Sequence, residues 1–159
     1  MTYYFDHIDR KIIQILQQKS NITNLKLSQN IGISPAATLE RVRKLEKKGV
    51  IQGYTLSLGL KKVHLHTQAV IMLSLINVHQ TTIKDVQQRL EKWHEVFHCY
   101  QILGKWDLLL HVIVSNTNNL QNFLAQKLST LNEVKTIHTM IITHTLKKNG
   151  ILAMPTTLD

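Results

Sequence analysis

The stretch that decides the fold, residues 22–51, reads ITNLKLSQNIGISPAATLERVRKLEKKGVI. Its first half places Leu27 and Ile31 four residues apart, so both lie on one face of a helix. The residues Gly-Ile-Ser-Pro follow Ile31 and form a turn. The first half therefore predicts a short amphipathic helix that ends in a glycine turn.

The second half of this stretch predicts a basic helix. Ser34 is placed to cap it and Pro35 to occupy its first position, and Gly49 is the residue expected just past its C-terminus. The helix holds five basic residues within eight positions, which are Arg41, Arg43, Lys44, Lys47 and Lys48. A short helix, a glycine turn and a basic helix are together the outline of a helix-turn-helix that reads the major groove of DNA.

The composition is that of a globular chain with a basic N-terminal part. Hydrophobic residues make up 43% of the 159 positions and charged residues 18%, values that allow a packed core. The net charge of +9 is uneven, because residues 1–66 carry 11 Lys and Arg against 4 Asp and Glu, whereas residues 67–159 carry 8 against 6. This asymmetry favours a polyanion partner for the N-terminal part. A single cysteine, Cys99, and the lack of a signal peptide or a long apolar run lead us to expect a cytoplasmic protein without a membrane partner.

A helical wheel divides the basic helix into two faces. Leu39, Val42 and Leu45 fall on one side, and we expect them to pack against a supporting helix and the first helix of the pair. Ala36 and Ala37 fall on the opposite side, where small side chains let the backbone approach a groove closely. The alternative for this helix is a solvated amphipathic surface, where runs of charge are common.

We expect the two arginines and the three lysines of the basic helix to make different contacts with DNA. Arg is the residue most often used for bidentate contact to guanine, so Arg41 and Arg43 are the candidates for base reading. Lys acts as a point charge on phosphate, so the three lysines are expected to position the backbone. The full set of residues expected at the DNA is Asn24, Ser34, Pro35, Ala36, Ala37, Thr38, Glu40, Arg41, Arg43, Lys44, Lys47 and Lys48.

The sequence also resembles a known family over nearly its full length. The segment SPAATLERVRKLEKKGVIQGY at Ser34–Tyr54 is similar to the Lrp/AsnC (feast/famine) transcription regulators, and FDHIDRKIIQILQ at Phe5–Gln17 resembles their first helix. The resemblance implies an α+β protein, with a winged helix-turn-helix followed by a ferredoxin-like effector and oligomerisation domain of the AsnC (RAM) type. It implies double-stranded DNA, further copies of the chain up to an octamer, and a small amino-acid-like effector as partners.

The periodicity of the C-terminal part predicts the ferredoxin-like fold independently. Strand-like runs cover 68–76, 96–103, 108–114 and 134–146, and amphipathic helices cover 82–93, capped by Thr81 or Thr82, and 118–131. The order βαββαβ is the split βαβ pattern. We place the domains at 5–66, which includes a linker strand at Val50–Leu58, and at 67–159. Apolar residues at both parities of the strands indicate a homodimer that packs sheet against sheet.

A turn between two of these strands is the candidate effector site. Gly104, Lys105, Trp106 and Asp107 resemble the Gly-Asp-aromatic-Asp loop near which amino acids bind between subunits in the family. Lys105 reverses the charge that is common at its position. The structural alternative is a hairpin turn whose glycine supplies an unusual backbone angle.

Catalytic and metal-binding patterns are missing from the sequence. There is no phosphate loop, nucleophile motif or acidic pair with an evident role, so we expect no enzyme activity and no cofactor. His64 and His66 share a strand face without a third ligand, so we expect no metal. We therefore predict a sequence-specific transcription regulator. The alternatives are an architectural protein that bridges or wraps DNA with little sequence preference, and a ferredoxin-like enzyme with a basic appendage.

Overall fold

The computed structural model describes residues 5–148 and 150–153, which form two compact units. The first unit takes the described residues up to Ser57 together with those from Lys147 onward, and the second is Leu58–Leu146. The C-terminal segment returns to the first unit through the amide of Gln17, which accepts from the Leu152 N–H at 2.7 Å and donates to the Leu152 carbonyl at 3.2 Å. The boundary by contacts thus falls earlier than the one expected after residue 66.

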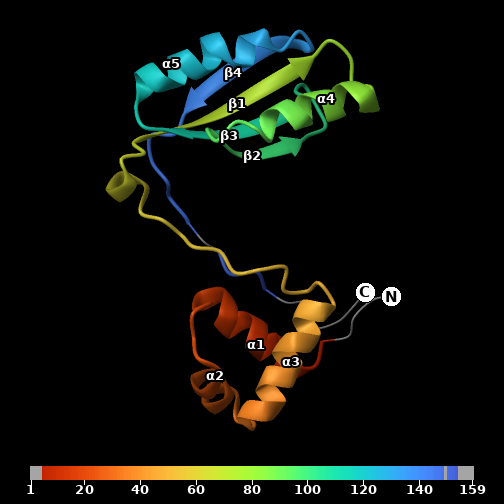
Figure 1. Ribbon diagram of the computed structural model, residues 1–159, viewed down its shortest axis with the longest axis vertical. Helices are drawn as coiled ribbons and strands as arrows, with labels where there is room; N and C mark the ends of the chain where they lie inside the picture. The colour runs from red at the N-terminus through yellow and green to blue at the C-terminus, as the bar shows by residue number, and fades with distance from the viewer. Residues whose placement is uncertain (1–4, 149, 154–159) are drawn as a thin grey trace. The chain divides into compact units, whose positions relative to one another are not determined.

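The described residues of the first unit form three helices, which are α1 (His7–Gln18), α2 (Asn24–Ile31) and α3 (Pro35–Lys47) (Figure 1). Each begins at a residue whose side chain caps it by accepting a backbone N–H, and these residues are Asp6, Thr23 and Ser34. One buried cluster holds the helices together, formed by Ile12, Ile13, Leu27, Ile31 and Leu45. The two helices predicted from residues 22–51 are therefore confirmed.

The strand predicted over Val50–Leu58 is wrong. Val50 and Ile51 pack against the cluster of the first unit, and residues 52–58 then continue without strand pairing to any described residue. Leu56 is 84% exposed, so the alternating apolar pattern does not mark a buried face here. A strand needs a neighbouring strand to pair with as well as an alternating pattern, and among the described residues no strand pairs with this segment.

The second unit is a four-stranded antiparallel sheet with two helices (Figure 1). The chain passes through η1 (Leu60–Val63), β1 (Thr67–Leu75), α4 (Gln80–Leu90), β2 (Val96–Gln101), β3 (Leu108–Val114), α5 (Thr117–Gln126), η2 (Leu128–Thr130) and β4 (Val134–Ile141). The strand order in space is β2-β3-β1-β4, so β1 and β3 are central. This arrangement confirms the predicted βαββαβ order.

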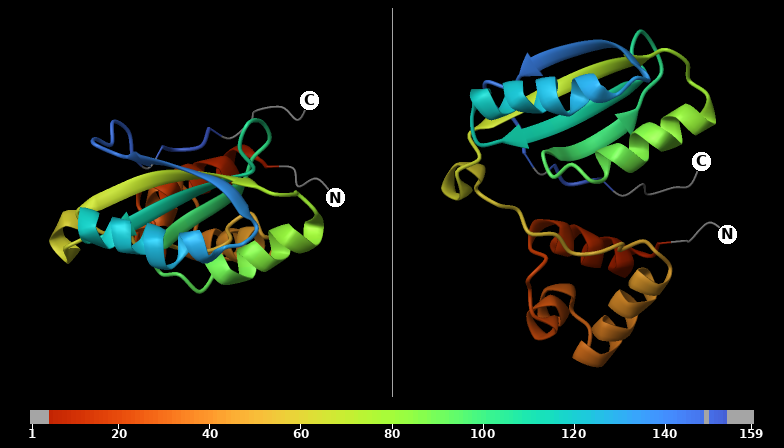
Figure 2. Two further views of the ribbon diagram at one scale, coloured as in Figure 1. Left: turned by 90° about the horizontal axis from the view of Figure 1, so that it is seen from above. Right: turned by 45° about the horizontal axis from the view of Figure 1, so that its top comes forward.

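Both helices cover the same face of the sheet (Figure 2). The residues of β1 alternate between buried and half-buried, and its buried set, with Ile71 and Leu73 at 0% exposure, packs under the helices with Val86 and Phe123. The helix predicted over 82–93 begins two residues earlier, at Gln80, and ends at Leu90. The Thr82 hydroxyl instead donates to Asn77 Oδ1 at 2.6 Å, in the turn before the helix.

The opposite face of the sheet is covered by no described helix and is rich in aromatic rings. The imidazoles of His98 and His111 stack with their centroids 6.2 Å apart, and the Trp106 ring stacks on His138 at 5.6 Å. His111 Nε2 lies 3.2 Å from Gln68 Oε1. Burial, followed by the nearby charge of His98, lowers the pKa of His111. None of the helices formed by the described residues combines the length and the apolar surface that a membrane span requires.

Candidate nucleic-acid interface

The start of α3 is fixed by hydrogen bonds from both sides of the turn. Gly32 ends α2 with a φ of 89°, a left-handed conformation that suits glycine. The Ser34 hydroxyl oxygen accepts from the Ala37 N–H at 3.2 Å, and Pro35 opens the helix. The Asn24 side chain donates to the Pro35 carbonyl at 2.8 Å. Asn24 therefore joins the start of α2 to the start of α3 and sets how the two helices meet.

One predicted contact residue on α3 faces the interior. Thr38 is 0% exposed, and its hydroxyl donates to the Ser34 carbonyl at 3.0 Å. A buried hydroxyl needs such a partner, because an unpaired one costs about 1–3 kcal/mol. Thr38 and Leu45 lie seven residues apart, which is about two helical turns, and they form the inner side of α3. Thr38 is thus part of the packing of the helix and does not reach its outward face.

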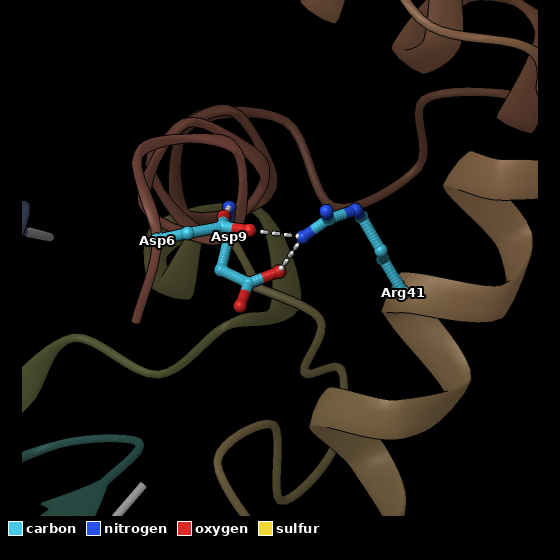
Figure 3. A network of polar contacts seen from close by, with 3 residues as sticks. All are labelled: Asp6, Asp9 and Arg41. Carbon is cyan, nitrogen blue, oxygen red and sulfur yellow. Dashed lines mark hydrogen bonds and ion pairs between the residues drawn. The ribbon is translucent and has the colours of Figure 1, made fainter. Parts of the chain in front are cut away.

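Arg41 is held by two carboxylates at the start of α1 (Figure 3). Its Nη1 donates to Asp6 Oδ2 at 2.7 Å and to Asp9 Oδ1 at 2.9 Å. Burial would raise the pKa of Asp6, but hydrogen bonds from the Asp9 N–H and from Arg41 outweigh it and hold this pKa below its ordinary value. Hydrogen bonds to Asp6 and Asp9 raise the pKa of Arg41. The guanidinium therefore ties α3 to α1, and this engagement competes with any contact to a base.

The outward face of α3 keeps most of the predicted contact residues. Its exposed members are Ser34, Pro35, Ala36, Glu40, Arg43, Lys44, Lys47 and Lys48, with Ala37 half-buried. Lys44 and Lys47 lie in the last turn, where positive charge also complements the helix dipole. Arg43 projects from this face and has no ion pair with another described residue. The face can therefore offer one arginine fork and several cations to a polyanion.

Leu39 belongs to this outward face, and the prediction that it packs inside is wrong. Its side chain is 39% exposed and does not join the buried cluster of the first unit. The helical wheel groups Leu39 with Val42 and Leu45 and so predicts that it faces inward. The inner side is instead occupied by the polar side chains of Thr38 and Arg41, because each has a hydrogen-bond partner there. The sequence signal for this orientation is the pair of carboxylates at Asp6 and Asp9, because two neighbouring carboxylates favour an arginine on the side of α3 that faces them.

Beyond α3, the linker is fastened to the same helix. The Tyr54 hydroxyl donates to Glu46 Oε1 at 3.0 Å. Burial raises the pKa of Tyr54, and the Glu46 carboxylate adds to the shift. Sequence reasoning did not single out either residue. Tyr54 holds the chain that leaves α3 at Glu46, in the last turn of the helix.

The predicted effector turn forms a compact structure between β2 and β3. Gly104 has a φ of 141°, which favours glycine, and Lys105 Nζ lies 5.3 Å from the centroid of the Trp106 ring. Asp107 Oδ2 accepts from the Leu75 N–H at 2.7 Å, and the Asp107 N–H donates to the Leu73 carbonyl at 2.9 Å. The Asp107 carboxylate is therefore engaged at the end of β1, while Lys105 is exposed.

Two other features bear on small ligands. A groove of about 440 Å³ lies between α4 and β2, lined on one side by Ile83 and Leu90 and on the other by Val96 and Phe97. The rings of His64 and His66 are 6.3 Å apart, and no group of three metal-ligating side chains occurs among the residues that the structure describes.

The two units correspond to two family models. Residues 5–52 match a winged helix-turn-helix DNA-binding model, and residues 68–152 match the Lrp/AsnC ligand binding domain. A DNA-binding helix-turn-helix followed by a ligand-binding domain defines a class of transcription regulators. Within that class the chain belongs to the Lrp/AsnC family, and the curated relatives described below are regulators.

Individual relatives support the same assignment. The leucine-responsive regulatory protein of Rhizobium meliloti (strain 1021) is 33% identical, over 89% of this chain and 91% of that protein. The transcriptional regulator AzlB of Bacillus subtilis (strain 168) is 28% identical, over 93% and 94%. A transcriptional regulator from Neisseria meningitidis, crystallised as its L-Met complex, superposes with a TM-score of 0.89 at 28% identity, over 94% of this chain and 97% of that one.

Proposed function

We propose that this regulator binds double-stranded DNA with the outward face of α3 in the major groove, and that Arg43 reads a base there. Lys44, Lys47 and Lys48 position the helix on phosphates, and Ala36 lets its N-terminal end approach closely. The observation that carries the proposal is the division of α3 into an inner side that is packed and paired and an outer side that keeps an exposed arginine beside lysines. An arginine fork can add a preference for particular DNA sequences to the nonspecific attraction of the lysines. An architectural protein that binds DNA with little sequence preference would not need such an arginine.

Three predicted contact residues take positioning roles in this proposal. Asn24 and Thr38 hold the turn and the inner side of α3 through the Pro35 and Ser34 carbonyls. Arg41 orients α3 on α1 through Asp6 and Asp9. Their substitution is expected to weaken binding to all DNA sequences alike, because it disturbs the helix rather than a base contact.

We also propose that two copies pack through the sheet face that lacks helices. Support comes from the half-buried apolar side chains of Val70, Met72 and Leu109, which share this face with the stacked imidazoles of His98 and His111. Two sheets facing each other would remove these groups from water, which favours association. A twofold-symmetric dimer presents two α3 helices and suits a pseudo-palindromic site. Assemblies of such dimers, up to the octamer, extend the same proposal.

For the effector, we propose a small amino-acid-like molecule that binds near Gly104–Asp107. The Neisseria meningitidis regulator in its L-Met complex supports this class of ligand. Lys105 is exposed and cationic, so it suits the carboxylate of such a molecule, while the Asp107 carboxylate already accepts the Leu75 N–H. The effector would act by favouring one assembly of subunits over another with a different affinity for DNA. Isothermal titration calorimetry with the twenty amino acids tests this, and a ligand whose affinity is unchanged in Lys105→Ala would contradict the role of the lysine.

The proposal for α3 is tested by comparing Arg43→Ala with Lys47→Ala. A preferred site is first selected from random DNA with the wild-type chain, and both variants are titrated on that site and on a scrambled duplex. Arg43→Ala should lower the affinity for the preferred site about 5- to 150-fold and the affinity for the scrambled duplex much less. This range corresponds to a bidentate base contact of about 1–3 kcal/mol. Lys47→Ala should lower the affinity for both duplexes equally. It should also reduce the salt dependence of the affinity by the amount that about one phosphate contact contributes. Equal losses for Arg43→Ala on both duplexes would contradict base reading by Arg43.

A further inference from the structure

The outward face of α3 carries one large apolar side chain, Leu39. It is 39% exposed, whereas Val42, three residues later, packs against the buried cluster of the first unit. At about 100° per residue, Leu39 lies about 40° around the helix axis from Arg43, the proposed base reader. An exposed leucine is ordinary on most surfaces, but here it stands beside the group that would enter the groove.

The surroundings of Leu39 leave it accessible to a partner. Ala36, one turn before it, is exposed and ends at its Cβ atom. The long side chain of Arg41 lies on the inner side of α3, where Asp6 and Asp9 hold it, so it does not cover Leu39. Leu39 therefore presents methyl groups between a small residue and an arginine.

We propose that Leu39 reads the 5-methyl group of a thymine in the major groove and so determines part of the sequence preference. The inference rests on the proposed function, because it requires α3 to lie in the major groove. The thymine methyl is the apolar group that base pairs present there, and apolar side chains recognise it by contact. Polar side chains in its place would lose water without gaining a hydrogen bond. Leu39 would thus separate A·T from G·C pairs at one position of each half-site.

The spacing along α3 relates this thymine to the base read by Arg43. The four residues from Leu39 to Arg43 rise about 6 Å along the helix axis, at about 1.5 Å per residue. Base pairs are stacked about 3.4 Å apart. A helix lying along the groove therefore places the thymine within about two base pairs of the guanine that Arg43 contacts.

The test removes the methyl group alone. In the preferred site, each thymine is replaced singly by deoxyuridine, and the full-length chain is titrated on every duplex, as the wild type and as Leu39→Ala. At one thymine per half-site, deoxyuridine should lower the affinity of the wild type about fourfold, the value for one buried methyl-sized group. At that position Leu39→Ala should bind the thymine and deoxyuridine duplexes equally.

Two further variants separate this contact from a structural effect. Leu39→Met keeps an apolar side chain and should retain sensitivity to the methyl group. Leu25→Ala removes a leucine of α2 that is 58% exposed, and it should also retain this sensitivity. If Leu39→Ala and the wild type respond equally to deoxyuridine at every thymine, Leu39 does not read a methyl group. If the wild type prefers no sequence at all, the proposed function fails as well, and the two failures are thereby distinguished.

Discussion

Replacing Arg41 by alanine should destabilise the first unit without selectively changing DNA sequence preference. Asp6 is 40% exposed, so its ion pair with Arg41 contributes about 0.2–1 kcal/mol. Asp9 is 6% exposed, and a buried carboxylate that loses a hydrogen-bonded cation costs about 1–3 kcal/mol. Together these terms give a loss of about 2 kcal/mol, which changes the folded-to-unfolded ratio roughly thirtyfold. Arg43→Ala, two residues along the same helix, should stay within about 0.5 kcal/mol because its side chain is exposed.

Hydrogen exchange measured peptide by peptide reports the first unit separately. Amides of α1 and α3 should exchange about thirtyfold faster in Arg41→Ala, and those of the sheet should not change. The effect should also depend on pH. Because the folded-state pKa of Asp6 lies below its unfolded value of about 3.9, its contribution is present above that pH and is lost as the pH falls through the folded-state pKa. Unchanged exchange together with a loss confined to the preferred DNA site would refute the structural role and make Arg41 a base reader.

Three further predictions concern the remaining contacts. Asp107→Ala should cost about 1–2 kcal/mol by leaving the Leu75 N–H unpaired, seen as a lower urea midpoint in tryptophan fluorescence, while Asp107→Asn keeps an acceptor and should lose less; equal midpoints would contradict this. Because burial lowers the pKa of His111 below its unfolded value of about 6.5, the second unit should lose stability as the pH falls below that value, and His111→Gln should flatten the profile; an unchanged slope would show that another group titrates. Gln17→Ala should speed amide exchange at Leu152, whereas the exposed neighbour Gln18→Ala should not; equal protection in both would show that the Gln17 amide does not hold this segment.

The periodicity of the chain was enough to predict its regular elements. The order of strands and helices in the second unit and the helix pair around Gly32 follow from apolar spacing and capping residues, which are local properties. The strand over Val50–Leu58 could not be excluded in that way, because strand formation depends on a partner far along the chain or in another copy. Apolar alternation is the same whether that partner is present or not.

The orientation of α3 depended on polar contacts that a wheel does not contain. Thr38 and Arg41 lie on the inner side because the Ser34 carbonyl and the Asp6 and Asp9 carboxylates receive them. Leu39 is displaced outward as a consequence. A ranking by hydrophobicity would place Leu39 inside and the two polar residues outside. It fails here because a polar group that has a hydrogen-bond partner can be buried at little cost. Most of the residues predicted at the DNA lie on α3, and the contacts of Thr38 with Ser34 and of Arg41 with α1 separate the inner side of this helix from its outer side.

The affinity ratio between a selected site and its scrambled counterpart examines the proposed reading of DNA by α3 most directly. Both duplexes are titrated with the full-length chain at the same salt concentration, because phosphate contacts dominate affinity and depend on salt. A sequence-reading α3 predicts a preference of about a thousandfold or more for the selected site. Equal affinity for the two duplexes would contradict it and would leave a protein that holds DNA by charge alone.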